Sequence, residues 1–496
     1  MRKLLLPCLL LVAVAAAQTK PAAKKATDPA AVHASALVVD THADTPQRLL
    51  DEHFDLATNT RDGHIDFGKA KQGNLGAEFF SIWVEPSESN KGHYAKRALE
   101  LIDSVYQQAE KHPDQMVMAF SADDIVKART GPHKRLAALM GIEGGHAIED
   151  SLPLLRDFYR LGVRYMTLTW SNTNEWADSS GDIDDPKVEH HAGLAPFGRQ
   201  VVQEMNRLGM IVDVSHVSDK TFYHAVLVSR APVIASHSSS RALTNHPRNM
   251  TDDMLRAMNR NGGVVMVNFF SAFIDEDFRK AFTAQAKERS AAVDKTVAGW
   301  KAAHPGEPVP YYVEDKVEKE WAAKIPRPPL KSLIDHIDHI AKVAGIDHVG
   351  LGSDFDGVST LPQGIDSVAD IPKITAELMK RGYTAADMKK ILGGNLMRVF
   401  REVERTSREI RKEDAAKARS VADTEEKFLL MKGDSPLTLD DVLYLLNGGI
   451  SSDHVKAIVS SHGAKFVPDG GAQANIRSAG GDDALLQAIT ANQKKD

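Results

Sequence analysis

Imidazole and carboxylate side chains follow several short apolar segments that lie far apart in this chain. Each of these segments ends in His, Asp or Glu, and the residues concerned are His42, Asp44, Glu143, His216, His237 and Asp354. Imidazole and carboxylate groups together suit zinc or a similar divalent ion. One catalytic zinc takes only three protein ligands, so the set is large enough for two ions that share a bridging carboxylate.

Each of these residues also has an ordinary structural interpretation. A single His at the end of a strand is more often a hydrogen-bonding group than a ligand, and Asp or Glu there often caps a helix. Ser215 and Ser236, which precede His216 and His237, are themselves potential caps. The metal-site hypothesis therefore rests on the joint placement of the residues, not on any one of them.

Other histidines lack an apolar strand before them. His336 and His339 have the i, i+3 spacing of a metal pair, but we expect them on the outside of the fold and predict that they are solvated. His190 and His191 belong to a polar loop, and His462 lies near the carboxyl terminus.

The elements that must position the candidate ligands alternate between apolar strands and amphipathic helices. Eight strands are predicted, over residues 36–39, 75–84, 136–142, 163–169, 210–214, 232–236, 263–268 and 348–352. A ninth, edge strand is predicted at residues 116–120. Continuously apolar strands that alternate with helices indicate a parallel sheet buried on both faces. Eight of them predict an α/β fold, a (β/α)8 TIM-type barrel, in which all strand ends meet at one mouth.

The rest of the chain divides around this barrel. Before it, we predict a signal peptide at residues 1–17 and a flexible leader at 18–34. The barrel itself takes residues 35–403, with a helical insertion before its last strand at 272–330. After it, we predict a charged helical linker at 404–434 and a small, mainly helical C-terminal unit at 435–496. The signal-peptide prediction rests on two cations, a short apolar run and small residues up to Ala17. The run is too short for a transmembrane helix, so we expect a protein exported to the periplasm or the extracellular space.

Composition narrows the chemistry further. Lys and Arg number 61 and Asp and Glu 67, a net charge of −6 that argues against a nucleic-acid partner. The single cysteine, Cys8, lies in the predicted signal peptide, which leaves a mature chain without disulfides, cysteine-zinc sites or thiol nucleophiles. A homodimer is the commonest default assembly for such a chain and stays open.

At its motifs the sequence resembles the membrane (renal) dipeptidase family, a branch of the metal-dependent amidohydrolase barrels, over roughly residues 36–405. The segments that carry the resemblance are Asp40-Thr-His-Ala-Asp44, Gly141-Ile-Glu-Gly-Gly-His146, Arg164-Tyr-Met-Thr-Leu-Thr-Trp-Ser171, Trp176-Ala-Asp178, Asp213-Val-Ser-His216, Ser236-His-Ser-Ser239, Arg248-Asn249, Gly352-Ser-Asp-Phe-Asp-Gly357 and Asn395-Leu-Met-Arg-Val-Phe400.

The resemblance implies an exported zinc-dependent dipeptidase with two zinc ions. His42, Asp44 and Glu143 would hold one ion, and His216 and His237 the other, with Glu143 bridging both. A hydroxide between the metals would attack the peptide carbonyl of the substrate.

Two further residues gain a role only through the resemblance. Asp354 matches the carboxylate that meets the free amino group of the substrate and carries a proton. Arg248 matches the residue that pairs with the terminal carboxylate of the dipeptide, a task that suits a bidentate guanidinium. Without the resemblance, Arg248 would be interpreted as a surface ion pair.

Trp170 departs from the family pattern, which usually has a His there. An indole N–H can donate a hydrogen bond but cannot relay a proton, and a lost donor of this kind costs on the order of 2.7–4 kcal/mol of transition-state stabilisation. Either Trp170 points its N–H at the substrate, or Asn172 or Asn174 replaces it, or the substrate differs. The alternatives are therefore an N-acyl amino acid or lactone hydrolase on the same metals, and a metal- and dipeptide-binding protein with weakened catalysis.

Overall fold

The computed structural model describes residues 28–58, 62–87, 90–131, 133–432 and 435–494. Within them one parallel sheet winds into a nearly closed barrel of eight strands, which confirms the predicted (β/α)8 fold. The barrel strands are β1 (Val38–Ala43), β2 (Leu75–Trp83), β4 (Leu136–Glu143), β5 (Val163–Thr167), β6 (Ile211–Asp213), β7 (Ile234–Ala235), β8 (Val264–Val267) and β9 (Val349–Leu351). A parallel bridge from Ala43 to Phe355, just beyond β9, brings the last strand back to the first.

The ninth strand, β3 (Met116–Met118), lies outside this circle. It pairs with Leu136–Ala138 at the start of β4, next to the part of β4 that pairs with β5. The edge strand predicted from the sequence is therefore present.

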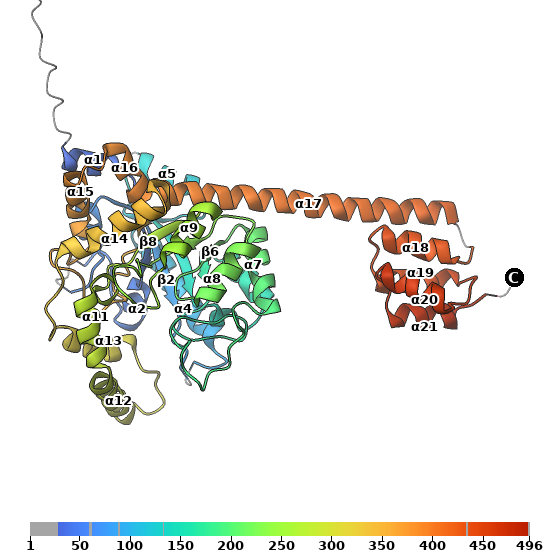
Figure 1. Ribbon diagram of the computed structural model, residues 1–496, viewed down its shortest axis with the longest axis horizontal. Helices are drawn as coiled ribbons and strands as arrows, with labels where there is room; N and C mark the ends of the chain where they lie inside the picture. Colours follow the sequence, from blue (N-terminus) through green and yellow to red (C-terminus); the bar gives the residue numbers. More distant parts are fainter. Residues whose placement is uncertain (1–27, 59–61, 88–89, 132, 433–434, 495–496) are drawn as a thin grey trace, which may run out of the picture.

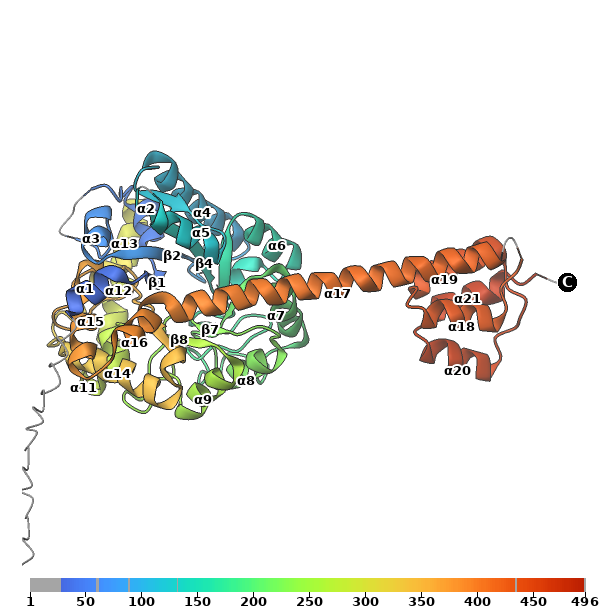
Figure 2. The same cartoon turned by 90° about the horizontal axis from the view of Figure 1, so that it is seen from above.

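Helices surround the barrel (Figures 1 and 2). The covering helices are α2 (Thr45–Asp51), α3 (Phe67–Gln72), α4 (Tyr94–Lys111), α5 (Ala122–Thr130), α6 (Leu152–Arg160), α7 (Pro196–Leu208), α8 (Asp219–Val228), α9 (Asp252–Asn261), α14 (Leu330–Val343), α15 (Ile371–Lys380) and α16 (Ala385–Lys389). The predicted caps form: Ser218 accepts from the Thr221 N–H and Thr251 from the Met254 N–H. Gly345 follows α14 at a φ of +97°, which glycine adopts readily.

The lumen of the barrel is filled by apolar side chains, as expected of a packed core. Val39, Phe79, Leu139, Tyr165 and Met266 are all fully buried there. The first turns of α17 (Asn395–Lys432) close the end of the barrel opposite the mouth, because the Phe400 ring lies 6.4 Å from the Phe79 ring.

Between β8 and β9 the chain forms α10 (Ser271–Ile274), α11 (Glu276–Ala284), α12 (Ala286–Ala303) and α13 (Tyr311–Ala322). These helices fall in the segment predicted as an insertion. The backbone N–H of Tyr311 donates to Asp51 on α2 at 2.9 Å, which ties α13 to the barrel.

The prediction of a flexible leader over residues 18–34 is wrong for its last part. Residues Pro29–Ser35 form helix α1, with Asp28 as its N-cap and a proline in its first turn. The ring of His33 bonds the Thr375 hydroxyl at 2.8 Å and the Gly73 carbonyl at 2.9 Å, so the helix is fixed to the barrel. The predicted signal peptide, residues 1–17, lies outside the described residues.

The prediction that His336 and His339 are solvated is wrong for His336. Its side chain is 1% exposed, and its Nδ1 accepts the Ser240 N–H at 3.0 Å. His339 is half-buried, with Nε2 2.7 Å from Asp252. The loop after β7 covers this face of α14, and periodicity within the helix carries no information about such a loop.

Helix α17 continues from the barrel through the segment predicted as a linker and projects away from it (Figures 1 and 2). At its far end lie α18 (Leu439–Asn447), α19 (Ser452–His462), α20 (Gly470–Ser478) and α21 (Asp483–Ala491), which enclose a hydrophobic core of their own. No helix among the described residues is both long enough and apolar enough to cross a bilayer.

Candidate metal centre and active site

The five predicted ligand side chains meet at the carboxyl end of the barrel. Glu143 lies at the end of β4, and its two carboxylate oxygens face two different groups of side chains. Oε2 lies 3.3 Å from Nε2 of His42, while Oε1 lies 2.9 Å from Nε2 of His216 and 3.4 Å from Nε2 of His237. Asp44 joins the first group, 3.5 Å from His42 Nε2. Glu143 thus stands between two sets of donors, as a bridging carboxylate would.

The orientation of His42 is set by a hydroxyl group in the lumen. Tyr165 donates its O–H to the Thr41 carbonyl at 3.1 Å, so it accepts from Nδ1 of His42 at 2.7 Å. That proton on Nδ1 leaves a lone pair on Nε2, toward the carboxylates. The tyrosine ring fits because residue 141 is glycine, where a Cβ would lie 2.0 Å from the ring.

His237 is oriented in the same way through Ser236 and Asp213. The Ser236 hydroxyl donates to Asp213 at 2.6 Å and therefore accepts from His237 Nδ1 at 2.8 Å. The backbone N–H groups of Ser215 and Ser236 also donate to Asp213. The two serines serve this network and do not cap helices.

Two imidazole nitrogens face each other in the second group. Nε2 of His216 and Nε2 of His237 are 2.9 Å apart. Burial, together with the Arg248 cation, lowers the pKa of His216 to about 4, and burial with the His42 ring lowers the pKa of His237 well below its usual range. Burial opposes ionisation of Glu143, yet the histidines around it lower the pKa of its carboxyl. Neutral imidazoles and a carboxylate aimed at one point fit a cation between them.

Unpaired polar atoms support the same conclusion. His42 Nε2 and Asp44 Oδ1 are buried and have no hydrogen-bond partner among the described residues. Ligand atoms of His42, Asp44 and Glu143 lie within 4.8 Å of one another, as do those of Glu143, His216 and His237. The donor set therefore fits two divalent ions of the zinc type.

Backbone strain marks the same positions. His216 and Asp354 have φ values of +66° and +64°, a region that residues other than glycine rarely adopt. The His216 carbonyl is held by the Ser180 N–H at 2.7 Å and by the Ser180 hydroxyl at 2.8 Å. Such strain persists where the surroundings fix it, and it clusters at functional sites.

Asp354 lies beside the two ligand groups. It accepts from Asn268 at 2.8 Å, and its other oxygen is 4.0 Å from His42 Nε2. Burial, with the charges of Asp44 and Glu143, raises its pKa to about 7. A carboxyl with this pKa can hold or release a proton near neutral pH.

Arg248 is buried, not on the surface as its sequence context alone would suggest. It is 6% exposed and donates to the His237 carbonyl at 3.0 Å and to the Ser238 hydroxyl at 3.3 Å. Its Nε has no partner among the described residues. Burial lowers its pKa to about 10, which leaves a guanidinium cation with an unused donor beside the metal centre.

Trp170 lines the cavity above the metal centre, with its ring 6.2 Å from that of His216. Asn174 does not line the cavity, and its amide donates to the Leu168 carbonyl and accepts from the backbone N–H of Trp176. Asn172 is not among the residues that line the cavity.

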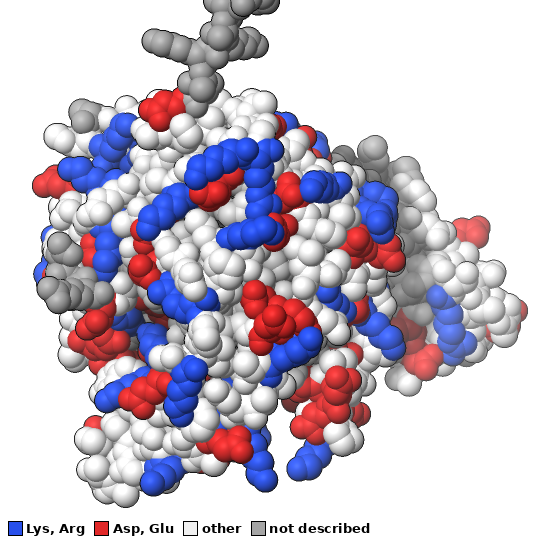
Figure 3. Space-filling view, turned by 60° about the vertical axis from the view of Figure 1, so that its left-hand side comes forward, with Lys and Arg blue, Asp and Glu red and all other residues white. Residues whose placement is uncertain are grey.

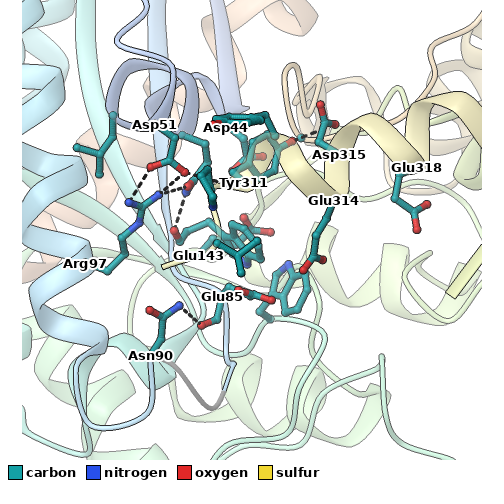
Figure 4. Close-up of a pocket in the computed structure, with 18 of the residues that line it drawn as sticks. Asp44, Asp51, Glu85, Asn90, Arg97, Glu143, Tyr311, Glu314, Asp315 and Glu318 are labelled. Atoms are coloured by element: carbon teal, nitrogen blue, oxygen red, sulfur yellow. Dashed lines mark hydrogen bonds and ion pairs between the residues drawn. The ribbon is translucent and has the colours of Figure 1, made fainter. Parts of the chain in front are cut away.

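The cavity has a volume of about 1090 Å³ and opens above the carboxylates (Figure 4). Its floor includes Asp44, Glu143 and Asp354, and one wall comes from α13. Sequence reasoning missed Tyr311 of α13, whose hydroxyl donates to the Asp356 carbonyl at 2.5 Å. It also missed the role of Tyr165, which lies inside a strand where an aromatic residue is ordinary.

Comparisons with known proteins agree with this geometry. A family model described as membrane dipeptidase (peptidase family M19) matches residues 27–414. Dipeptidase tcpJ of Claviceps purpurea (strain 20.1) is 36% identical over 350 residues, which cover 69% of this chain and 70% of that protein.

Solved structures have the same barrel. The probable dipeptidase PvdM of Pseudomonas aeruginosa superposes with a TM-score of 0.64 at 28% identity, covering 76% of this chain and 98% of its own. A metallo peptidase of Rhodobacter sphaeroides, crystallised with a phosphinate mimic of the dipeptide L-Ala-D-Ala, gives 0.59 at 23% identity, covering 74% and 99%. At that identity the second likeness shows the fold alone.

Proposed function

The chain belongs to the membrane dipeptidase family, peptidase family M19, and on that premise we propose that it is an exported metallo-dipeptidase that works with two zinc ions. The observation that carries this proposal is the position of Glu143. One of its oxygens faces His42, and the other faces His216 and His237. A carboxylate placed in this way is expected where two cations share one ligand.

Zinc ions held by these residues would polarise the peptide carbonyl and lower the pKa of a bound water molecule. Residues of the chain itself bind the substrate and move the proton. Arg248 presents its free Nε to the terminal carboxylate of the substrate. Asp354 accepts a hydrogen bond from the free ammonium group of the substrate, takes up the proton that the attacking water releases, and passes it to the nitrogen that leaves when the peptide C–N bond breaks. Recognition of both termini limits the substrate to two residues.

An assay of dipeptide hydrolysis, with metal analysis of the same sample, tests the proposal. We expect the zinc-loaded protein to release free amino acids. We expect Glu143→Gln to lose both zinc ions and at least about a thousandfold in kcat/KM, because a neutral amide offers one oxygen where the carboxylate offers one to each group of donors. Glu409→Gln, on α17 away from the mouth, is the matched control. Retention of two zinc ions and full activity by Glu143→Gln would overturn the proposal, as would faster turnover of N-acetylated amino acids than of dipeptides.

Trp170 supports a second candidate, a protein that binds metal and dipeptide with little catalysis. Its indole stands where the family usually has a proton-carrying imidazole. Under this alternative the purified protein would hold zinc and a dipeptide for hours without cleavage, and Trp170→His would start hydrolysis. Under the main proposal the wild-type chain turns over without the substitution.

Export rests on the N-terminal sequence alone, two cations followed by an apolar run that ends near Ala17. N-terminal sequencing of the protein from the periplasm or the medium should begin at Gln18. Recovery of the protein only inside the cell, with Met1 intact, would contradict it.

A further inference from the structure

Helix α13 forms a fixed wall of the active-site cavity. Its first residue, Tyr311, is held on two sides: its N–H by Asp51 at 2.9 Å, and its hydroxyl by the Asp356 carbonyl at 2.5 Å. Asp51 is itself paired with Arg97 at 2.9 Å (Figure 4). The insertion is therefore part of the substrate site.

Aromatic rings cover the inner part of this side of the cavity. Trp83, at the end of β2, lies between Trp170, with ring centroids 5.0 Å apart, and Tyr311, with centroids 6.2 Å apart. All three line the cavity. Nε1 of Trp83 is buried without a hydrogen-bond partner among the described residues. Faces of Trp and Tyr attract cations as well as apolar stems.

Two carboxylates without a cation partner follow the rings. Glu85 comes two residues after Trp83, and Glu314 extends from α13 toward it across the cavity (Figure 4). No described cation lies within ion-pair distance of either carboxylate. Burial and the charge of Glu85 raise the pKa of the Glu314 carboxyl, with Lys301 opposing only in part.

Three neighbouring ion pairs compensate their own charges, whereas Lys301 acts on Glu314 only from beyond ion-pair distance. Lys96 binds Glu100, Lys319 binds Asp315 at 2.7 Å, and Arg289 binds Glu318 at 2.9 Å. Apart from the candidate metal ligands and Asp354, the described carboxylates that line the cavity without an ion pair are Glu85, Glu314 and Glu307, and Glu307 is exposed. Glu85 and Glu314 lie in a cavity that the substrate must enter, beyond rings that suit an alkyl stem.

We propose that Trp83, Tyr311, Glu85 and Glu314 form a subsite for a cationic side chain, so that the enzyme prefers dipeptides with lysine or arginine as the first residue. This inference rests on the proposed function, because Asp354 places the amino end of the substrate. Asp354 follows β9, which lies next to β1 and two strands from β2, and Trp83 ends β2. Arg248, for the carboxyl end, donates to the carbonyl of His237, two residues beyond β7, and β7 is opposite β2 in the circle of eight strands.

A comparison of three substrates tests the subsite: Lys-Ala, norleucine-Ala with the same stem and no side-chain charge, and Ala-Ala as the reference. We expect kcat/KM for Lys-Ala to exceed that for norleucine-Ala by about 10- to 100-fold, the range expected for a charge-assisted contact with a cation–π contribution. In the double variant Glu85→Gln/Glu314→Gln this ratio should fall below about threefold, with each single variant between.

Glu100→Gln, which removes a paired carboxylate from the same cavity, is the matched control and should keep the ratio. Equal rates for Lys-Ala and norleucine-Ala in the wild type, or an unchanged ratio in a folded double variant, would overturn the subsite while hydrolysis of Ala-Ala still supported the dipeptidase. Hydrolysis of none of the three would overturn both.

Discussion

Tyr165 decides which nitrogen of His42 faces the metal centre. The hydroxyl has one proton, which it gives to the Thr41 carbonyl, and so it can only accept from His42 Nδ1. Groups that orient a metal ligand in this way typically contribute 10- to 100-fold to metal affinity. The lumen of the barrel therefore acts on the chemistry at its mouth.

We predict that Tyr165→Phe lowers zinc affinity at the site of His42 and Asp44 by about 10- to 100-fold, because the imidazole loses the acceptor that fixes its tautomer. Competition with a chromophoric chelator measures the two sites separately. The site of His216 and His237, which Ser236 orients, should keep its affinity. Tyr383→Phe, which loses a hydrogen bond to Asp338 far from the mouth, is the control. Equal weakening of both sites, or of neither, would count against the role of Tyr165.

Some roles of single residues can be predicted from the sequence, and others cannot. The five predicted ligands lie at or just beyond the end of an apolar strand, and parallel strand ends meet at one mouth, so they could be predicted: His42, Asp44, Glu143, His216 and His237. Asp213 and Tyr165 could not be assigned their roles, because their meaning depends on hydrogen bonds across the lumen. Tyr311 is joined to the site only by the path of an insertion, for which no local pattern exists.

Among the elements, the strands were easier to predict than the surfaces of the helices. Strand order follows from alternation with helices and from right-handed crossovers. The side of α14 that faces the loop after β7 depends on where that loop runs, so the sequence of the helix alone predicts a solvated His336, whereas the loop buries it. Helix α1 had a local signal, Asp28 followed by Pro29, that the low-complexity composition around it obscured.

Burial of His336 makes the stability of the barrel depend on pH. Its pKa is lowered to about 4 by burial, against an ordinary value of 6.5. Between pH 4 and pH 6.5 the unfolded chain binds a proton at His336 that the folded chain does not. The contribution of neutral, buried His336 to the unfolding free energy is therefore complete above pH 6.5 and is lost as the pH falls toward 4. Protonated Nδ1 could no longer accept the Ser240 N–H.

We predict that the wild type loses about 2 kcal/mol more unfolding free energy between pH 7 and pH 5 than His336→Gln does. Urea unfolding at the two pH values measures this difference, with the variant less stable at pH 7. His304→Gln, at the exposed residue that follows α12, should behave like the wild type. A parallel loss in wild type and His336→Gln would remove His336 as the cause.

On the scale of the whole molecule, the barrel is separate from the helices at the end of α17. The family model ends at residue 414, and α18–α21 have their own core. On the face shown in Figure 3, cationic and anionic side chains are interspersed. No residue of α18–α21 lines the cavity described above.

We therefore predict that a chain ending at Asp414 keeps kcat/KM for dipeptides within about twofold, the usual limit for changes remote from a site. Steady-state kinetics of the shortened and full chains make the comparison at equal zinc content. Loss of more than tenfold in a folded, zinc-loaded protein would mean that the C-terminal helices take part in catalysis.

Anomalous X-ray diffraction at the zinc edge, from crystals of the zinc-loaded protein, tests the central claim most directly. We predict two anomalous peaks at the barrel mouth, one bonded by His42 and Asp44, one by His216 and His237, and both by Glu143. A single peak, or zinc bound without Glu143, would contradict it.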